Sequence, residues 1–274
     1  MTRAAVGIAL RPEHIQHLVS CPVKELWFEV RAEDHMGGGA GDPAQVEDLR
    51  NAGHEISLHG AGLSLAGTAQ ADPGRLAALK RLADRVEPIL VSEHLAWPRL
   101  DGRCLPDLLP VPRTNEVLAR CARNIGRVQD LLGRRILIEN PVHYLDLRDH
   151  SWTETSFLSE LSRRSGCGLL VDVNNVAVAA HNIGFIASEW LDAIPEGCVC
   201  EIHLAGHMPD PEGTLLVNSD DAPVSDQVWQ LYRRLADRVG PRPTLIEGAR
   251  SFATLMHERS RARNILDGEM ALAA

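Results

Sequence analysis

The chain has 274 residues, of which 45% are hydrophobic, and its formal net charge at neutral pH is −9. A chain of this size and apolar content can bury a large core as one domain. The acidic balance opposes general attraction to nucleic acid or anionic lipid. No apolar run approaches the about 20 residues that span a bilayer, and no signal-peptide pattern opens the chain, so we expect a cytoplasmic protein without a membrane or nucleic-acid partner.

Eight short apolar runs recur along the chain with little polar alternation, which is typical of buried parallel strands. The runs are residues 6–10, 26–30, 55–59, 89–94, 135–140, 168–173, 198–203 and 244–247. Apolar residues at three- and four-residue spacing predict amphipathic helices at 73–86, 114–132, 153–165 and 226–239. The residues placed to begin or end these helices are Asp72, Thr114, Thr153, Ser225, Gly133 and Gly240.

Eight strand-then-helix units in this length favour an α/β fold, a single-domain (β/α)8 TIM barrel over residues 1–274, because closure removes the sheet edges. A doubly wound open sheet is the main structural alternative. It would leave two edge strands, and it usually carries a glycine fingerprint after its first strand. Here that turn reads Arg11-Pro12-Glu13-His14, so the fingerprint is absent.

The six cysteines are scattered and contain no Cys-x-x-Cys pair, which argues against a zinc ribbon or a thioredoxin-like redox motif. Cys198 and Cys200 share one face of a predicted strand, and we interpret them as small core residues. We expect all of these thiols to be reduced.

Potential metal ligands stand where the apolar runs end. In a barrel, the carboxyl ends of the strands meet at one mouth, where catalytic groups lie. The run-end residues are Glu29, His59, Glu93 or His94, Glu139, Asp172, His203 and Glu247. Acids crowded at a narrow mouth repel one another unless cations neutralise them, so we predict a metal site.

Mixed nitrogen and oxygen ligands suit iron, manganese, zinc or cobalt better than calcium or magnesium. Six or seven side chains exceed what one catalytic ion with open positions needs, which indicates more than one ion. A carboxylate from a middle strand, Glu139 or Asp172, could bridge two ions.

Six ordered segments together resemble the serial motifs of the multinuclear non-heme iron-dependent oxidative enzymes. The segments are Leu58–Leu65, Val91–Trp97, Ile138–Pro141, Val171–Asn175, Glu201–His207 and Thr244–Glu247. The resemblance extends from Gly7 to Glu247 and includes relatives that modify cysteine residues in ribosomally made peptides.

The resemblance implies a TIM barrel that holds two or three irons, uses dioxygen as co-substrate and oxidises a cysteine-containing precursor peptide presented by a separate peptide-recognition protein. The positions that match family metal ligands are His59, His94, Glu139, Asp172, His203 and Glu247. Glu139 matches the bridging position, and Glu139, Asp172 and His203 are the expected catalytic residues.

The chain also departs from the family pattern. Relatives usually carry Asp-Thr-His-Gly after the seventh strand, a segment that helps to hold a third iron, whereas this chain has Asn218-Ser219-Asp220-Asp221. We therefore expect two irons, with Asn175 and Asp220 as the remaining candidates for a weak third site. The usual His-Ala-Glu-Asn-Tyr stretch reads Arg31-Ala32-Glu33-Asp34-His35, and Gly248 replaces a frequent Trp, so the substrate or the activity can differ.

Several of these polar residues have structural alternatives. Asn174 and Asn175 are also placed to cap a helix or a turn. His207 could be a hydrogen-bond partner of a ligand or a loop residue. Because Glu93 adjoins His94 in one strand, only one of them can face the mouth, and we expect Glu93 to face away and form a hydrogen bond or salt bridge.

Three functional classes follow. The first is an iron-dependent oxidase of a peptide. The second is a divalent-metal isomerase or epimerase of the xylose-isomerase-like barrel type, which needs no oxygen. The third is a degenerate member that binds a peptide or a partner without turnover, as the altered segment Asn218–Asp221 suggests; retention of the main ligand positions argues against it.

Overall fold

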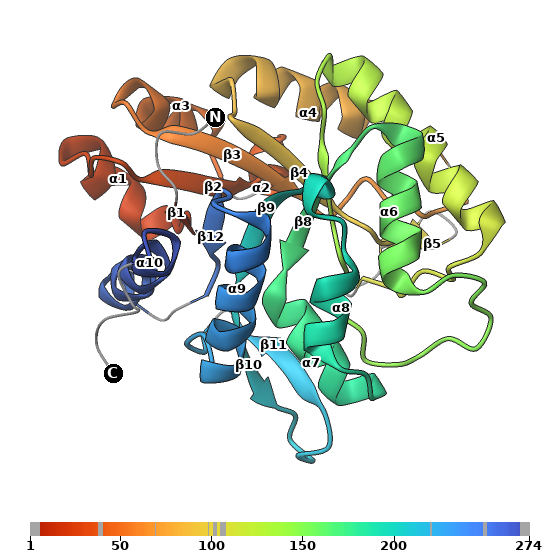
Figure 1. Ribbon diagram of the computed structural model, residues 1–274. Coiled ribbons are helices and arrows are strands. Elements are labelled where there is room, and N and C mark those ends of the chain that lie inside the picture. Colours follow the sequence, from red (N-terminus) through yellow and green to blue (C-terminus); the bar gives the residue numbers. More distant parts are fainter. Residues whose placement is uncertain are drawn as a thin grey trace.

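The computed structural model describes residues 6–37, 41–68, 70–97, 99–100, 103–104, 108–219, 221–248 and 251–268. Within these residues, eight parallel strands form a closed barrel, and helices surround it (Figure 1). Around the barrel, the strands are β1 (Val6–Ala9), β2 (Trp27–Arg31), β3 (Glu55–Gly60), β4 (Leu90–His94), β7 (Leu137–Glu139), β8 (Gly168–Asp172), β9 (Val199–Leu204) and β12 (Thr244–Ile246). β12 pairs with β1, so the open doubly wound sheet is excluded and the single-domain TIM barrel is confirmed.

The outer layer consists of helices that follow the strands in chain order. They are α1 (Pro12–Ser20), α2 (Ala32–His35), α3 (Pro43–Asn51), α4 (Pro73–Val86), α5 (Asn115–Leu132), α6 (Glu154–Ser165), α7 (Val173–Ile183), α8 (Ala187–Ala193), α9 (Asp226–Val239) and α10 (Phe252–Leu266), with a short 3-10 turn at Glu196–Cys198. Within the described residues, no helix is both long and apolar enough to cross a bilayer.

The predicted helix boundaries agree with the hydrogen bonds at the helix ends. The side chains of Asp72, Thr114 and Thr153 each accept a hydrogen bond from a backbone N–H in the first turn of α4, α5 and α6. Ser225 does the same for α9. Gly133 follows α5 at φ +68°, a left-handed conformation that glycine adopts without strain.

The barrel interior changes from apolar to polar along the strands. Trp27 and Leu245 pack together inside the barrel with Ile89, and a Cβ on Gly7 would overlap the Trp27 ring, so glycine is required to admit the indole. Side chains two residues apart on a strand share a face. Glu29 and Glu247 therefore stand one step closer to the mouth than this apolar cluster.

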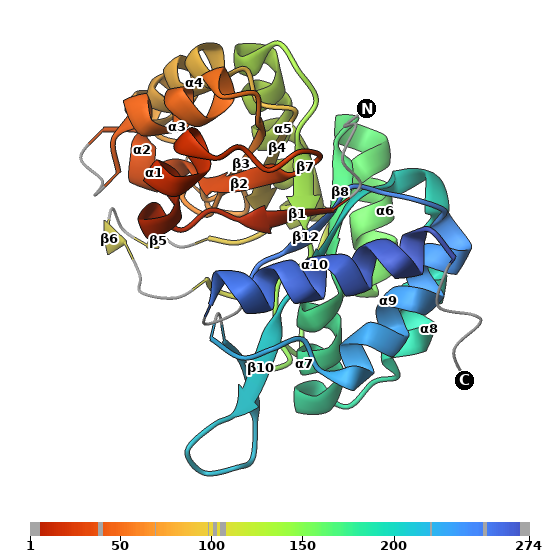
Figure 2. The same cartoon turned by 90° about the vertical axis from the view of Figure 1, so that its left-hand side faces the viewer.

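Two antiparallel hairpins interrupt the strand and helix alternation. One joins β5 (Arg99–Leu100) to β6 (Arg103–Cys104), and the other joins β10 (Gly206–Pro209) to β11 (Leu216–Ser219). The β10–β11 hairpin projects from the body of the molecule beside α7 (Figure 2). It begins directly after β9 and therefore lies at the end of the barrel where the ligand-type residues gather.

Candidate metal centre

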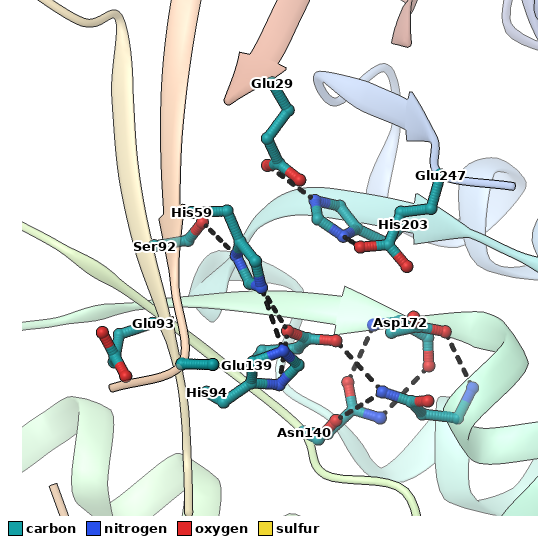
Figure 3. A network of polar contacts seen from close by, with 12 residues as sticks. Glu29, His59, Ser92, Glu93, His94, Glu139, Asn140, Asp172, His203 and Glu247 are labelled. Atoms are coloured by element: carbon teal, nitrogen blue, oxygen red, sulfur yellow. Dashed lines mark hydrogen bonds and ion pairs between the residues drawn. The ribbon is translucent and has the colours of Figure 1, made fainter. Parts of the chain in front are cut away.

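Acidic and imidazole side chains converge at the carboxyl ends of the barrel strands (Figure 3). We call this set the mouth cluster; it consists of Glu29, His59, His94, Glu139, Asp172, Glu201, His203 and Glu247. Its members come from seven strands or the residues that directly follow them. Strand closure brings together residues that are far apart in the chain, and the two-residue period turns them to the interior.

Two histidines and one carboxylate lie close together on one side of the mouth, with ligand atoms within 4.8 Å of one another. The Nε2 atoms of His59 and His94 are 3.0 Å apart. Glu139 Oε2 lies 3.2 Å from His59 Nε2 and 2.9 Å from His94 Nδ1. Yet His94 Nδ1 and Glu139 Oε2 are buried without a hydrogen bond of acceptable geometry within the described residues. The two Nε2 atoms are within hydrogen-bond distance of each other, so it is His94 Nδ1 and Glu139 Oε2 that remain available to an ion.

Two further groups meet at His203. Ligand atoms of Glu139, Asp172 and His203 lie within 4.8 Å of one another, and so do those of Glu29, Glu201 and His203. His203 Nε2 is 3.4 Å from Glu29 Oε2 and 3.6 Å from Glu201 Oε1. Glu139 belongs both to the group with Asp172 and to the group with the other two histidines, and its role as a bridging carboxylate stays a prediction.

Neighbouring groups fix the orientation of two of the imidazoles. Ser92 Oγ lies 2.8 Å from His59 Nδ1, and Glu247 Oε1 lies 3.1 Å from His203 Nδ1. When Nδ1 carries the proton and donates it to such a partner, the lone pair of Nε2 is left for a metal. Both rings are therefore turned with Nε2 toward the other members of the mouth cluster.

The charges of the cluster shift one another strongly. Burial opposes protonation of His59, but the carboxylates of Glu29 and Glu139 outweigh it and raise the pKa of this imidazole to about 10. His203 is raised well above its ordinary pKa in the same way, by Glu29 and Glu247 against burial. Burial would raise the pKa of Glu139, but His94 and His59 lower it below the usual range.

Two carboxyl groups respond in the opposite direction. Burial, followed by the charges of Glu247 and Glu139, raises the pKa of Asp172 well above its ordinary value. Burial also raises the pKa of Glu201, whose two oxygens have no hydrogen-bond partner within the described residues. The mouth cluster contains five acids and three imidazoles. Bound protons therefore neutralise part of the surplus negative charge, which a metal cation would also neutralise.

These observations fit a metal. Buried unpartnered atoms of His94, Glu139, Asp172 and His203 point inward, and they are nitrogen and oxygen donors. Such donors suit first-row transition metals, with no thiolate among them. A cation among them would relieve the repulsion between buried carboxylates that otherwise destabilises the folded state.

The structure brings the predicted ligands together, with one difference in role. His59, His94, Glu139, Asp172 and His203 all belong to candidate ligand groups. Glu247 is adjacent, but it is placed as the hydrogen-bond partner of His203 and lies outside those groups. Its ligation stays a prediction.

Glu93 faces away from the mouth, as its position beside His94 predicted. It accepts a hydrogen bond from Leu63 N at 3.1 Å, and burial together with Glu33 raises its pKa to about 8. The prediction that Glu93 faces away from the mouth and forms a hydrogen bond is confirmed.

The expected helix cap needs correction, and the expected third metal site stays a prediction. Neither Asn174 nor Asn175 caps the following helix; Asp172 does so, because its Oδ1 accepts a hydrogen bond from Asn175 N at 2.7 Å. The cap comes earlier in the chain than the sequence suggested because α7 begins directly at the end of β8. Asp220, the other candidate for a third site, lies outside the described residues.

The sequence did not predict Glu201 as a member of the mouth cluster. It placed Glu29 at a strand end but gave it no ligand position. Glu201 stands two residues before His203 in β9, so the strand period turns both into the barrel. A glutamate in the middle of an apolar run is the sequence signal that could have revealed it, and in the structure this glutamate is fully buried.

A comparison with protein families identifies the chain. The model of the family described as "RiPP precursor modification enzyme MbnB/TglH/ChrH" matches residues 5–267. The chain belongs to this family. The resemblance that the six sequence segments indicated is thereby confirmed, and this MbnB/TglH/ChrH family member is a modifying enzyme whose family acts on ribosomally made precursor peptides.

Two relatives of similar length are UPF0276 proteins. The chain is 51% identical over 270 residues to a UPF0276 protein of Caulobacter vibrioides strain NA1000, covering 97% of this chain and 96% of that one. It is 41% identical to the UPF0276 protein RB0508 of Rhizobium meliloti, covering 98% of this chain and 94% of the relative.

Solved structures share the fold of this family member at low identity. Endonuclease IV from Thermus thermophilus aligns with a TM-score of 0.62 at 17% identity, covering 96% of this chain and 99% of that one. A xylose isomerase domain containing protein from Salmonella typhimurium LT2 aligns at 0.59 and 18%, covering 98% and 97%. These likenesses show the TIM-barrel fold alone.

Proposed function

We propose that this MbnB/TglH/ChrH family member is a non-heme iron enzyme that uses dioxygen to oxidise a cysteine residue of a precursor peptide. The observation that carries the proposal is the group of His59, His94 and Glu139, whose ligand atoms lie within 4.8 Å of one another, with His94 Nδ1 and Glu139 Oε2 unpartnered within the described residues. Two imidazoles and one carboxylate, with positions left open, are typical of non-heme ferrous oxygenases. Iron, when bound, would supply the one-electron and dioxygen chemistry that side chains lack.

A second ion fits the group of Glu139, Asp172 and His203. In this proposal Glu139 bridges the two positions, because it alone belongs to both groups. Asp172 and Glu139 contribute negative charge at the second position, whereas His59 and His94 are neutral donors at the first. Anionic donors favour the higher oxidation state of a metal and neutral donors the lower one, so the two positions would differ in redox character.

The protein residues around the ions hold the geometry. With the proton on Nδ1, His59 would donate to Ser92 and His203 would donate to Glu247, which would hold each Nε2 toward the ions. Asn140 and Asn175 bind the carboxyl end of β8 and Glu139, respectively. These contacts orient the ligands in advance, which reduces the reorganisation needed on metal binding.

An open pocket of about 470 Å³ lies beside Glu247, and in this proposal it would receive the substrate. The residues that line it are Ala9, Leu10, Arg11, Ser219, Asp221 and Glu247. Its volume is within the range of small-ligand sites, large enough for a cysteine side chain and flanking peptide. A separate peptide-recognition protein, expected from the family resemblance, would present the peptide here.

The test combines metal loading with peptide turnover. Protein purified without oxygen is loaded with ferrous iron, zinc or manganese and mixed with a cysteine-containing precursor peptide encoded beside its gene, with and without a neighbouring recognition protein. We expect oxygen consumption and a change in peptide mass with iron only, and no change for the same peptide with serine in place of cysteine. Binding of zinc or manganese with no uptake of iron would contradict the proposal and favour the isomerase alternative.

A further inference from the structure

A chain of side-chain amides connects the β10–β11 hairpin to Glu139. Asn218 on β11 donates through Nδ2 to Asn175 Oδ1 at 2.6 Å. Asn175 donates in turn through Nδ2 to Glu139 Oε1 at 3.0 Å. At the other end, Asn174 Nδ2 donates to Asn218 Oδ1 at 2.7 Å, and Asn174 Oδ1 lies 2.7 Å from His207 Nδ1.

Carbonyl oxygens, which can only accept, fix the direction of the Asn174 and Asn175 amides, and these two fix the direction of Asn218. Asn174 Nδ2 also donates to the carbonyl oxygen of Gly206 at 3.0 Å, so this atom must be nitrogen. Asn175 Nδ2 also donates to the carbonyl oxygen of Asn140 at 3.1 Å, so it must be nitrogen as well. Reversing any one amide would put two donors or two acceptors face to face somewhere along the chain.

One consequence concerns the oxygen of Asn175. An asparagine offers one side-chain oxygen, and here that oxygen accepts the amide of Asn218 at 2.6 Å. The residue is nearly inaccessible, with 2% of its surface exposed, so water does not compete for it. A cation at this oxygen would compete with the Asn218 amide, and displacing the amide would leave a half-buried donor without its partner, which is unfavourable.

We propose that the Asn218 amide takes the place of a third metal ion beside Asn175, so that this chain holds ions only at the two positions that share Glu139. The inference rests on the proposed function, because it concerns the same centre. The Asn218 amide donates to the oxygen of Asn175 and accepts from the nitrogen of Asn174, so these three neutral side chains satisfy one another without a cation. Asn175, held by this amide, also ties Glu139 Oε1 to the protein, which leaves Oε2 for the side of His59 and His94.

The proposal predicts what an acid at position 218 would do. In the Asn218→Asp variant, one carboxylate oxygen would still accept from Asn174 Nδ2, but the other would face the Asn175 oxygen across the present 2.6 Å contact. Two acceptors at that separation require a cation or a proton between them. Asn218→Asp should therefore open a third metal position with no other change to the chain.

The experiment counts manganese ions bound per chain, by equilibrium dialysis and elemental analysis, in the wild type, Asn218→Asp and Asn218→Leu. Leucine matches asparagine in size but offers no ligand. We expect two ions in the wild type, three in Asn218→Asp and two in Asn218→Leu. Three ions in the wild type, a third ion in Asn218→Leu, or no third ion in Asn218→Asp would each overturn the inference.

The count requires no peptide and no turnover, so the two proposals fail in different ways. If the wild type binds two ions and Asn218→Asp also binds two, only the inference about Asn218 is wrong. If the wild type binds no transition metal at all, the proposed function fails and takes the inference with it. Circular dichroism of each variant confirms that the barrel has folded before ions are counted.

Discussion

The side chain of Asn140 brackets the backbone of Asp172. Asn140 Oδ1 accepts a hydrogen bond from Asp172 N at 2.8 Å, and Asn140 Nδ2 donates to Asp172 O at 3.1 Å. The amide thus continues the pairing of β7 with β8 by one residue beyond the end of β7. It sets the backbone of a predicted metal ligand from the neighbouring strand.

Asn140→Ala should lower both the stability of the protein and its affinity for metal. Two buried backbone groups of Asp172 lose their partner, and we expect the free energy of unfolding to fall by about 1–3 kcal/mol. Urea unfolding of the metal-free protein measures the first effect, and metal titration the second. Asn124→Ala is the matched control: it removes a buried amide that donates to Leu65 O, away from the mouth cluster, so stability should fall while metal affinity is unchanged.

Glu139→Gln should lose both ions. The bridging carboxylate becomes a neutral amide with one oxygen, so neither position keeps a full ligand set. Elemental analysis after anaerobic loading with iron measures the count. Glu93→Gln is the control, because Glu93 is also buried and faces away from the centre. Full metal content in Glu139→Gln would show that Glu139 does not bridge.

Asp172→Asn should lose one ion, whereas Glu201→Gln should keep both. Asp172 shares a group with Glu139 and His203, but Glu201 lies one strand step deeper, where it meets His203 and Glu29. The count of bound iron distinguishes the two variants. If Glu201→Gln loses an ion and Asp172→Asn does not, the second ion lies in the deeper group of Glu29, Glu201 and His203.

The stability of the metal-free protein should depend on pH through Glu93. Its pKa is about 8 in the folded protein, against 4.5 for the free side chain, so the folded state binds this proton more tightly. The contribution of this proton to the free energy of unfolding is at its maximum below pH 4.5 and is lost as the pH rises toward 8. Urea unfolding across this pH range, with chelator present, measures the loss.

Glu93→Gln removes this titration, and the amide oxygen can still accept from Leu63 N. We expect the variant to be more stable than the wild type near the upper end of the range by about 2 kcal/mol, with the difference shrinking as the pH falls. Glu116→Gln, at an exposed helix start, should follow the wild type at every pH. Equal pH dependence of Glu93→Gln and the wild type would mean that Glu93 ionises normally.

Much of the fold and of the centre could be predicted because strand periodicity is local. An apolar run that ends on His59 or Glu139 shows both that a strand is present and which residue reaches the mouth. Barrel closure then needs no further information, since parallel strands with covering helices bring all run ends to one edge. The same period places Glu201 inside the barrel. It was not predicted, because the prediction used only the last residue of each run and Glu201 lies in the middle of one.

The pattern of apolar runs was enough to predict the barrel, the mouth and the kinds of ligand there, since these depend on the two-residue strand period and on the order of strands. The pairing of β12 with β1 was needed to exclude an open sheet, and the contacts that hold the ligands became visible only in the folded protein. Asn218 and Asn175 are 43 residues apart, and their hydrogen bond exists because the β10–β11 hairpin packs against α7. Likewise, Glu247 meets His203 through the pairing of β12 with β9. Such contacts depend on packing between elements, which no local pattern encodes.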